Sequence, residues 1–282
     1  MRRPVLVNGS LLALIVILGG LTWLSTQEQE ADHRILLTQL NPDQVNRITL
    51  DNQTGQAIRL EHTDGGWQML HPYEAKADDN RIQRLLEIVR SSSFSRFLAP
   101  ADVAEYGLAP PAAILTLNQI HVEVGATHPM NQHRYLRLKD QIHLIKDRFI
   151  HHLQARAEDF ISPALLPAGS RIRAIHTPEW KLSFSSSGKG SLDPPNTDVS
   201  GDDLNKKRDQ WLWARASRVV PAPEGIGSGR IEIKLEHEQQ PISFELGRSE
   251  QYTLLIRRDL GLAYAIPQKS KLLQPPENTS NK

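Results

Sequence analysis

The stretch HVEVG (121–125), RYLRLKD (134–140) and IHLIKD (142–147) decides the fold class. Apolar residues recur at short, mostly alternating intervals, the first part ends in a glycine, and turn-forming residues separate the last two. This pattern predicts a strand followed by a β-hairpin. The same layout returns near the end of the chain in ISFELG (242–247), YTLLIRR (252–258) and LAYAIP (262–267). The repeat predicts two related, strand-rich modules in tandem.

Upstream of each hairpin the pattern predicts further strands and a few helices. Asp78 is placed to cap a helix, because Ile82, Leu85, Leu86 and Val89 then fall on one face. A short helix is expected at 147–156. The segment after Asp203 fits a helix to Arg215 or a strand over 210–214. The other expected strands cover 45–50, 57–61, 67–70, 114–117, 171–175, 180–184 and, as the counterpart of 67–70, 211–213.

The first 24 residues predict a membrane anchor. The segment PVLVNGSLLALIVILGGLTWL (4–24) has 21 residues without a charge, about 31 Å of helix, which matches the hydrocarbon core. Arg2 and Arg3 precede it, so the positive-inside rule places residues 1–3 in the cytoplasm and residues 25–282 in the periplasm of a bacterial inner-membrane protein. The alternative is a cleaved signal peptide, but this stretch exceeds the usual apolar region and LTWLSTQEQE offers no small-x-small site.

The predicted fold class is therefore α+β. An N-terminal transmembrane helix (4–24) precedes two tandem strand-rich modules of mainly antiparallel sheet with few helices. We expect a juxtamembrane linker at 25–44, a first module at 45–167 and a second, related module at 168–274. Residues 185–203, rich in Ser, Gly, Pro and Asp, are expected to form a mobile loop, and 275–282 a disordered tail.

Composition excludes several functions. The chain has 282 residues, 39% hydrophobic and 23% charged, which is ordinary globular usage. Its formal net charge is +1, so we expect no nucleic-acid partner. The absence of cysteine excludes disulfides, thiolate metal sites and cysteine nucleophiles.

Histidine is the one unusual feature, with 11 in the chain. His121, His128, His133 and His143 are candidate metal ligands across a hairpin group. No helix carries two histidines at ligand spacing, and His121 and His143 occupy the polar phase of their strands, where we expect them to face solvent. The prediction is therefore no metal and no cofactor, with a metal or pH-responsive site as the alternative.

No motif predicts catalysis. The run GKGS (188–191) lacks the first glycine and the Ser/Thr directly after the lysine of a phosphate loop. Ser186 and Lys189 have the spacing of an acyl-enzyme pair but lie in a Ser/Gly-rich segment instead of at a rigid helix start. The paired carboxylates Asp78-Asp79 and Asp202-Asp203 suit helix caps or turns. We predict no catalytic residue.

The stretch of roughly residues 45–155 resembles a known family. The runs are GGWQMLHPYEAKADDNRIQRLLEIV (65–89), AEYGLAPPAAILTL (104–117), VEVG (122–125) and YLRLKDQIHLI (135–145). They are similar to an uncharacterised family of bacterial membrane-anchored proteins whose genes often lie beside ABC-2-type exporter and gliding-motility-like components. The matching motif positions are Trp67, Pro72, Asp78, Tyr106, Gly107, Leu108, Pro110, Gly125 and Tyr135.

These motif residues suit a scaffold. Gly107 can adopt positive φ and turn the chain, Pro110 holds the following residues extended, and Tyr106 and Leu108 can anchor the turn in the core. The resemblance implies no catalytic residue, because the family has none established, and it implies an association with exporters.

Three functions follow as expectations. The first is a non-enzymatic accessory protein that sits in the bilayer through residues 4–24 and binds a membrane or envelope protein such as an ABC exporter component. The second is a periplasmic ligand- or metal-binding sensor that uses the histidine-rich strands or a cleft between the modules. The third is a hydrolase of envelope material, which lacks a recognisable acid–base or nucleophile arrangement.

Overall fold

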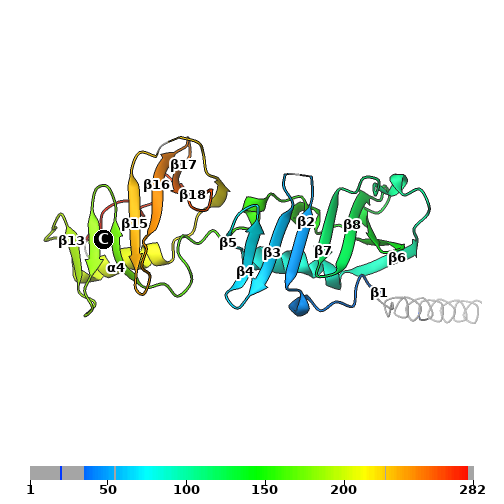
Figure 1. Ribbon diagram of the computed structural model, residues 1–282, viewed down its shortest axis with the longest axis horizontal. Coiled ribbons are helices and arrows are strands. Elements are labelled where there is room, and N and C mark those ends of the chain that lie inside the picture. The colour runs from blue at the N-terminus through cyan, green and yellow to red at the C-terminus, as the bar shows by residue number, and fades with distance from the viewer. Residues whose placement is uncertain (1–19, 21–34, 54, 226, 279–282) are drawn as a thin grey trace, which may run out of the picture.

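The computed structural model describes residue 20 and residues 35–53, 55–225 and 227–278. These residues form two sheets that follow one another along the chain (Figure 1), and every pairing between their strands is antiparallel. The predicted mainly antiparallel architecture with few helices is confirmed in this part of the chain.

The first sheet has ten strands in the order β1-β6-β10-β9-β8-β7-β2-β3-β4-β5. Their bounds are β1 (Ile35–Leu36), β2 (Arg47–Asp51), β3 (Ile58–Thr63), β4 (Gly66–His71), β5 (Ala75–Lys76), β6 (Ser92–Leu98), β7 (Ala113–Leu117), β8 (Ile120–Thr127), β9 (His133–Leu138) and β10 (Gln141–Lys146). The predicted hairpin group is thus β8, β9 and β10, in that order across the sheet.

The second sheet has eight strands in the order β13-β12-β11-β15-β16-β17-β18-β14. Their bounds are β11 (Ile172–His176), β12 (Lys181–Phe184), β13 (Gly190–Asp193), β14 (Arg218–Pro221), β15 (Arg230–Leu235), β16 (Ile242–Arg248), β17 (Tyr252–Arg257) and β18 (Leu262–Pro267).

The two sheets share one strand order. Without the two-residue strands β1 and β5, the first sheet reads β4-β3-β2-β7-β8-β9-β10-β6, and each of these strands has a counterpart at the same place in the second sheet. The longer helices α2 (Asp79–Leu86) and α4 (Gly201–Leu212) also lie at equivalent points of the chain, because the next strands after them are β6 and β14. The repeated hairpin pattern therefore reflects a repeated topology.

The helices begin where polar caps precede them. Asp78 caps α2 (Asp79–Leu86), which continues as the 3-10 helix η2 (Glu87–Arg90), and the apolar face Ile82, Leu85 and Leu86 is buried. Ser200 and Asp203 form a capping box on α4 (Gly201–Leu212). The remaining helices are single turns: α3 (Ile150–Leu153), η1 (Pro42–Gln44), η3 (Ala104–Tyr106) and η4 (Ala157–Phe160).

The second half settles one open choice and corrects two expectations. α4 settles the open choice over 203–215 in favour of a helix. The expected strand 211–213 is wrong, since Trp211 lies fully buried in α4 and β13 takes the place equivalent to β4. The expected loop 185–203 is wrong for Gly190–Asp193, because pairing with β12 supplies the backbone partners that a Ser/Gly sequence does not signal. It is also wrong for residues 201–203, which form the first turn of α4.

The ends of the modules also differ from expectation. β1 pairs with β6, and Leu37 is buried in the core, so the residues from Ile35 onward belong to the first sheet and not to a linker ending at 44. In the expected disordered tail, Pro276 is buried and Glu277 pairs with Lys271 at 2.9 Å. Residues 279–282 lie outside the described residues.

The expected anchor, residues 4–24, lies outside the described residues except for Gly20. Among the helices that the structure does describe, none combines the length and the apolar character needed to cross a bilayer.

Candidate functional site

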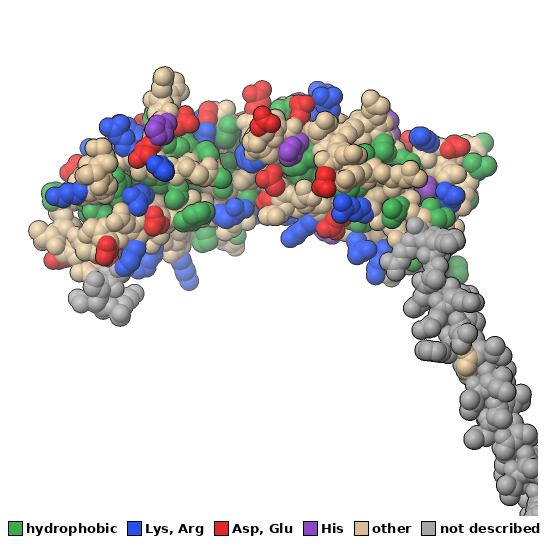
Figure 2. Space-filling model, turned by 90° about the horizontal axis from the view of Figure 1, so that it is seen from below, with side chains coloured by type: hydrophobic (Ala, Val, Ile, Leu, Met, Phe, Trp, Pro, Cys, Tyr) green, Lys and Arg blue, Asp and Glu red, His purple; other side chains and the backbone are tan. Residues whose placement is uncertain are grey.

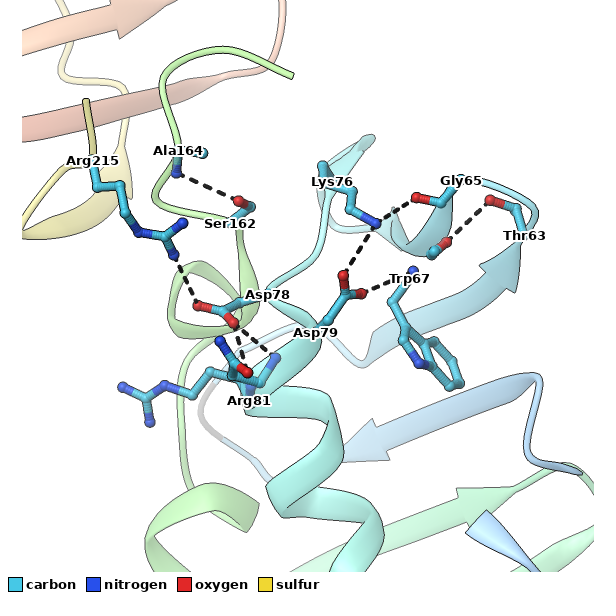
Figure 3. Close-up of polar contacts among 12 residues, drawn as sticks. Thr63, Gly65, Trp67, Lys76, Asp78, Asp79, Arg81, Ser162, Ala164 and Arg215 are labelled. Carbon is cyan, nitrogen blue, oxygen red and sulfur yellow. Dashed lines mark hydrogen bonds and ion pairs between the residues drawn. The ribbon is translucent and has the colours of Figure 1, made fainter. Parts of the chain in front are cut away.

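The junction between the two sheets is built around Asp78 (Figure 3). Its carboxylate accepts hydrogen bonds from the backbone N–H groups of Asn80 at 3.0 Å and Arg81 at 3.4 Å. The other carboxylate oxygen lies 4.0 Å from Nη2 of Arg215, which follows α4. One side chain thus starts the helix of the first sheet and reaches a residue of the second half.

Backbone hydrogen bonds reinforce this junction. Toward the first sheet, Ser162 donates its N–H to the carbonyl of Lys76 at 2.9 Å. Toward the second half, Leu165 donates to the carbonyl of Ala214 at 3.1 Å, next to a β-bridge between Ala164 and Arg215. The connecting segment is therefore paired on both sides, which restricts movement at the junction.

Asp79, which follows Asp78 in the sequence, also accepts a hydrogen bond from the backbone. It accepts from the N–H of Trp67 at 3.2 Å and lies 3.6 Å from Nζ of Lys76, which donates to the carbonyl of Gly65 at 2.6 Å (Figure 3). The ring of Trp67 is buried beneath this contact. The arrangement ties the β3–β4 turn to the start of α2 and leaves the carboxylates bonded to structural partners.

The motif residues between 106 and 135 come together on β8. Gly107 has φ +66°, and a Cβ there would lie 2.7 Å from the Cβ and the backbone nitrogen of Ala126. A Cβ at Gly125 would collide with the carbonyl oxygen of Tyr106, and Leu108 is buried against the same glycine. The turn therefore lies directly on the strand, and only glycine at both positions permits this approach.

Two aromatic rings complete this cluster. Tyr106 and Tyr135 pack edge to face with centroids 5.0 Å apart, and Phe97 of β6 lies 5.4 Å from Tyr106. Pro110 lies in the exposed turn that a bridge between Leu108 and Pro111 closes. Of the motif positions, Trp67 and Asp78 lie at the junction, Pro72 directly follows β4, and the others lie around β8.

Sequence reasoning missed Arg134, the most extensively bonded side chain of the first sheet. It donates to Asp147 at 2.7 and 2.9 Å, to the carbonyl of Gly125 at 2.6 Å and to Thr127 at 2.8 Å. Arg134 and Asp147 are both largely buried, with side-chain exposures of 13% and 16%. The only sequence signal that could have indicated this residue is the register of the hairpin, in which Arg134 of β9 is paired with Ile145 of β10.

The four candidate histidines do not form one site. His121 lies on the exposed side of β8 and bonds Thr116 at 2.9 Å, while His128 accepts from the N–H of Met130 at 3.2 Å. His133 stacks on Phe94 with ring centroids 4.2 Å apart. Across the described ranges, no three His, Asp or Glu side chains are grouped so that they can hold a metal ion.

The expectation that His143 faces solvent is wrong. His143 is 3% exposed and bonds Ser93 of β6 at 3.1 Å. The strand β10 is covered on both faces, and β6, which sequence reasoning did not predict, closes its side. Burial, and then the nearby charge of Arg96, lower the pKa of His143.

His152 is a second buried histidine that sequence reasoning did not single out. It is 6% exposed in α3, and its Nδ1 has no hydrogen-bond partner in the described structure. Burial first, and then the charges of His151, Arg81 and Arg84, lower its pKa to about 4. Protonation of this ring therefore destabilises the folded state.

A polar groove of about 560 Å³ on the second sheet is one candidate for a small-ligand site. Its arginines already have partners: Arg257 bonds Asp259 at 2.6 Å and Arg258 bonds Glu245 at 2.8 Å. The groove therefore has charges that compensate one another, and it does not favour an anion. On the face shown in Figure 2, basic and acidic side chains are likewise interspersed.

The fold and these contacts define a class: a tandem pair of antiparallel sheets in which the acids of the junction and the arginines of the groove bond to the backbone or to each other. A model of the family described as "Domain of unknown function (DUF4340)" matches residues 22–111 and, again, residues 67–224. The two matches together cover most of the chain, so the chain belongs to this family. No curated protein and no solved structure matches it.

Proposed function

We propose that the protein is a non-enzymatic scaffold of the bacterial inner membrane. Residues 4–24 anchor it, residues 25–282 lie in the periplasm, and the two sheets bind a membrane or envelope protein such as a component of an ABC-type exporter. The exporter association derives from the family resemblance, and the anchor from the uncharged length of residues 4–24.

The junction is the observation that carries the scaffold proposal. Two sheets of one strand order are linked by a segment with backbone bonds to both sides, and Asp78 is shared between α2 and Arg215. Such a junction holds two surfaces at a defined spacing. A membrane tether also raises the effective concentration of these surfaces for a membrane partner.

Membrane residence is tested by protease treatment of spheroplasts that carry the full chain. We expect degradation of the periplasmic part and survival of a short N-terminal fragment. A matched variant with residues 1–24 replaced by a cleavable secretion signal should appear in the soluble periplasmic fraction. A full chain protected in intact spheroplasts would refute the topology.

Partner binding is tested by photocrosslinking in membranes, with the crosslinker placed on either sheet. We expect the same envelope protein to be captured by the full chain and less efficiently by the secreted variant, since only the former is tethered. If neither sheet yields a reproducible envelope partner, the scaffold proposal fails.

A further inference from the structure

Residues 94–98 of β6 form an open sheet edge, which we call the β6 edge. On one side β6 pairs with β10 along residues 93–98, whereas on the other side β1 covers only Ser92 and Ser93. No other strand of the described chain lies against the β6 edge. Five residues of strand therefore have one side free for pairing.

At two residues of the β6 edge, the backbone N–H and C=O groups are directed away from the sheet. Ala99 donates its N–H to the carbonyl of Asp140, in register with the pairing of Leu98 to Gln141. Because hydrogen-bonded pairs alternate in an antiparallel ladder, the N–H and C=O groups of Arg96 and Leu98 point away from β10. These are the groups that an added strand requires.

The β6 edge exposes two large apolar side chains, with one charged side chain between them. Phe94 is 58% exposed and Leu98 is 69% exposed. Phe94 is also held in place by its stacking on His133. Arg96 is exposed and forms no hydrogen bond or ion pair within the part of the chain that the structure describes. The edge thus offers apolar contacts and one uncompensated positive charge.

The other three edges are protected. β5 has two residues, and β13 ends at Asp193, directly before Pro194. β14, which takes the place of β6 in the second sheet, has four residues and ends in Pro221, which has no N–H. Short edge strands, prolines and charges are the usual means of preventing edge pairing. Within one repeated topology, the β6 edge lacks this protection.

We propose that the β6 edge is a docking site for an extended segment of a partner protein, which adds to the first sheet as an antiparallel strand. The segment has an acidic side chain opposite Arg96 and an apolar side chain, two residues away, opposite Leu98. The inference deepens the proposed scaffold function and rests on it for the existence of a natural partner.

Two other occupants fit the edge less well. A second copy paired symmetrically about Arg96 would place this arginine directly opposite its equivalent, and like charges in that position are destabilising. The hydrocarbon of a lipid bilayer offers no hydrogen-bond partner for the unpaired N–H and C=O groups of Arg96 and Leu98.

The test is a selection of random ten-residue displayed peptides on the purified full chain in lipid nanodiscs. We expect enriched peptides to carry an acidic residue two positions from an apolar one. Leu98→Pro removes an outward N–H and should weaken their binding at least 10-fold relative to Leu98→Ala, which keeps it. Unchanged thermal unfolding of Leu98→Pro checks that the fold is retained.

Arg96→Glu is the second variant and keeps every backbone group. Selection on this variant should enrich basic residues where the original chain enriches acidic ones. The inference is overturned if no peptide is enriched, or if enriched peptides ignore both substitutions. It is also overturned if Arg96→Glu changes the oligomeric state, which would identify a second copy as the occupant. Since the selection needs no native partner, its failure leaves the crosslinking test of the scaffold proposal standing.

Discussion

Replacing Gly107 with alanine tests the packing of the motif turn on β8. Gly107 has φ +66°, and an added Cβ would lie 2.7 Å from the backbone nitrogen of Ala126, which cannot rotate away. Gly169 is the matched control, because it has φ +74° with no atom within 4 Å of the added Cβ. Both substitutions strain the backbone, and only the first creates a collision.

The magnitude follows from these two effects. A left-handed conformation costs an alanine about 1–2 kcal/mol, so Gly169→Ala should lower the free energy of unfolding by that amount. Forcing an extra methyl group into a packed site costs about 1–3 kcal/mol more. Gly107→Ala should therefore lose about 2–5 kcal/mol, and the collision alone should change the opening equilibrium roughly 5- to 150-fold.

The assay uses the absence of cysteine in the chain. A single thiol introduced by Ala113→Cys reports opening of the first sheet, and one introduced by Ala263→Cys reports opening of the second, since both alanines are buried. Gly107→Ala should accelerate labelling of the first thiol more than Gly169→Ala accelerates labelling of the second. Equal acceleration by the two substitutions would refute the contact between the turn and Ala126.

Three further predictions concern the junction, the buried ion pair and pH. Asp78→Ala should lower the free energy of unfolding by about 1 kcal/mol through loss of the helix cap. Arg215→Ala removes only the exposed partner of the ion pair with Asp78 and should lower it by less than about 1 kcal/mol. Chemical denaturation of both variants checks that Asp78→Ala has the larger effect. Arg134→Met should cost about 3–5 kcal/mol, because Asp147 is left buried and unpaired, and adding Asp147→Leu should recover part of the loss in a double-mutant cycle. The pKa of His152 is lowered from 6.5 to about 4 in the folded chain. Between these two pH values the unfolded state binds more protons than the folded state, so the free energy of unfolding should fall as pH decreases from 6.5 to 4. A smaller fall of this free energy in His152→Asn confirms the assignment, and an identical fall contradicts it.

Local patterns predicted the elements that depend on local physics. The cap at Asp78 and the apolar face beginning at Ile82 define α2 by spacing alone, and alternation defines β8, β9 and β10. The repeated topology was also visible, because the hairpin of residues 252–267 repeats the layout of residues 134–147. These features need no information about distant residues.

The errors occurred where a neighbour far along the chain decides the structure. β6 begins inside the serine run 91–93, which resembles a helix end, and it becomes a strand because β10 lies beside it. His143 is buried next to the same strand, where Ser93 of β6 is its hydrogen-bond partner. β13 depends on pairing with β12, although Gly190 and Ser191 have little intrinsic preference for a strand.

The proposed membrane anchor limits how far from the bilayer a partner of the β6 edge can lie. In the proposed topology, residues 25–34 connect the membrane segment to β1, and ten residues span at most about 36 Å. β1 pairs with β6 directly beside the open residues 94–98, so the edge lies at the same end of the first sheet as β1, the strand that follows the proposed tether in the sequence (Figure 1). A partner strand must therefore come within a few tens of ångströms of the bilayer. Lengthening the tether with a flexible insert should weaken capture of a membrane partner without changing affinity for a free peptide, because only the effective concentration changes. An equal loss in both measurements would show that the tether acts on the edge itself.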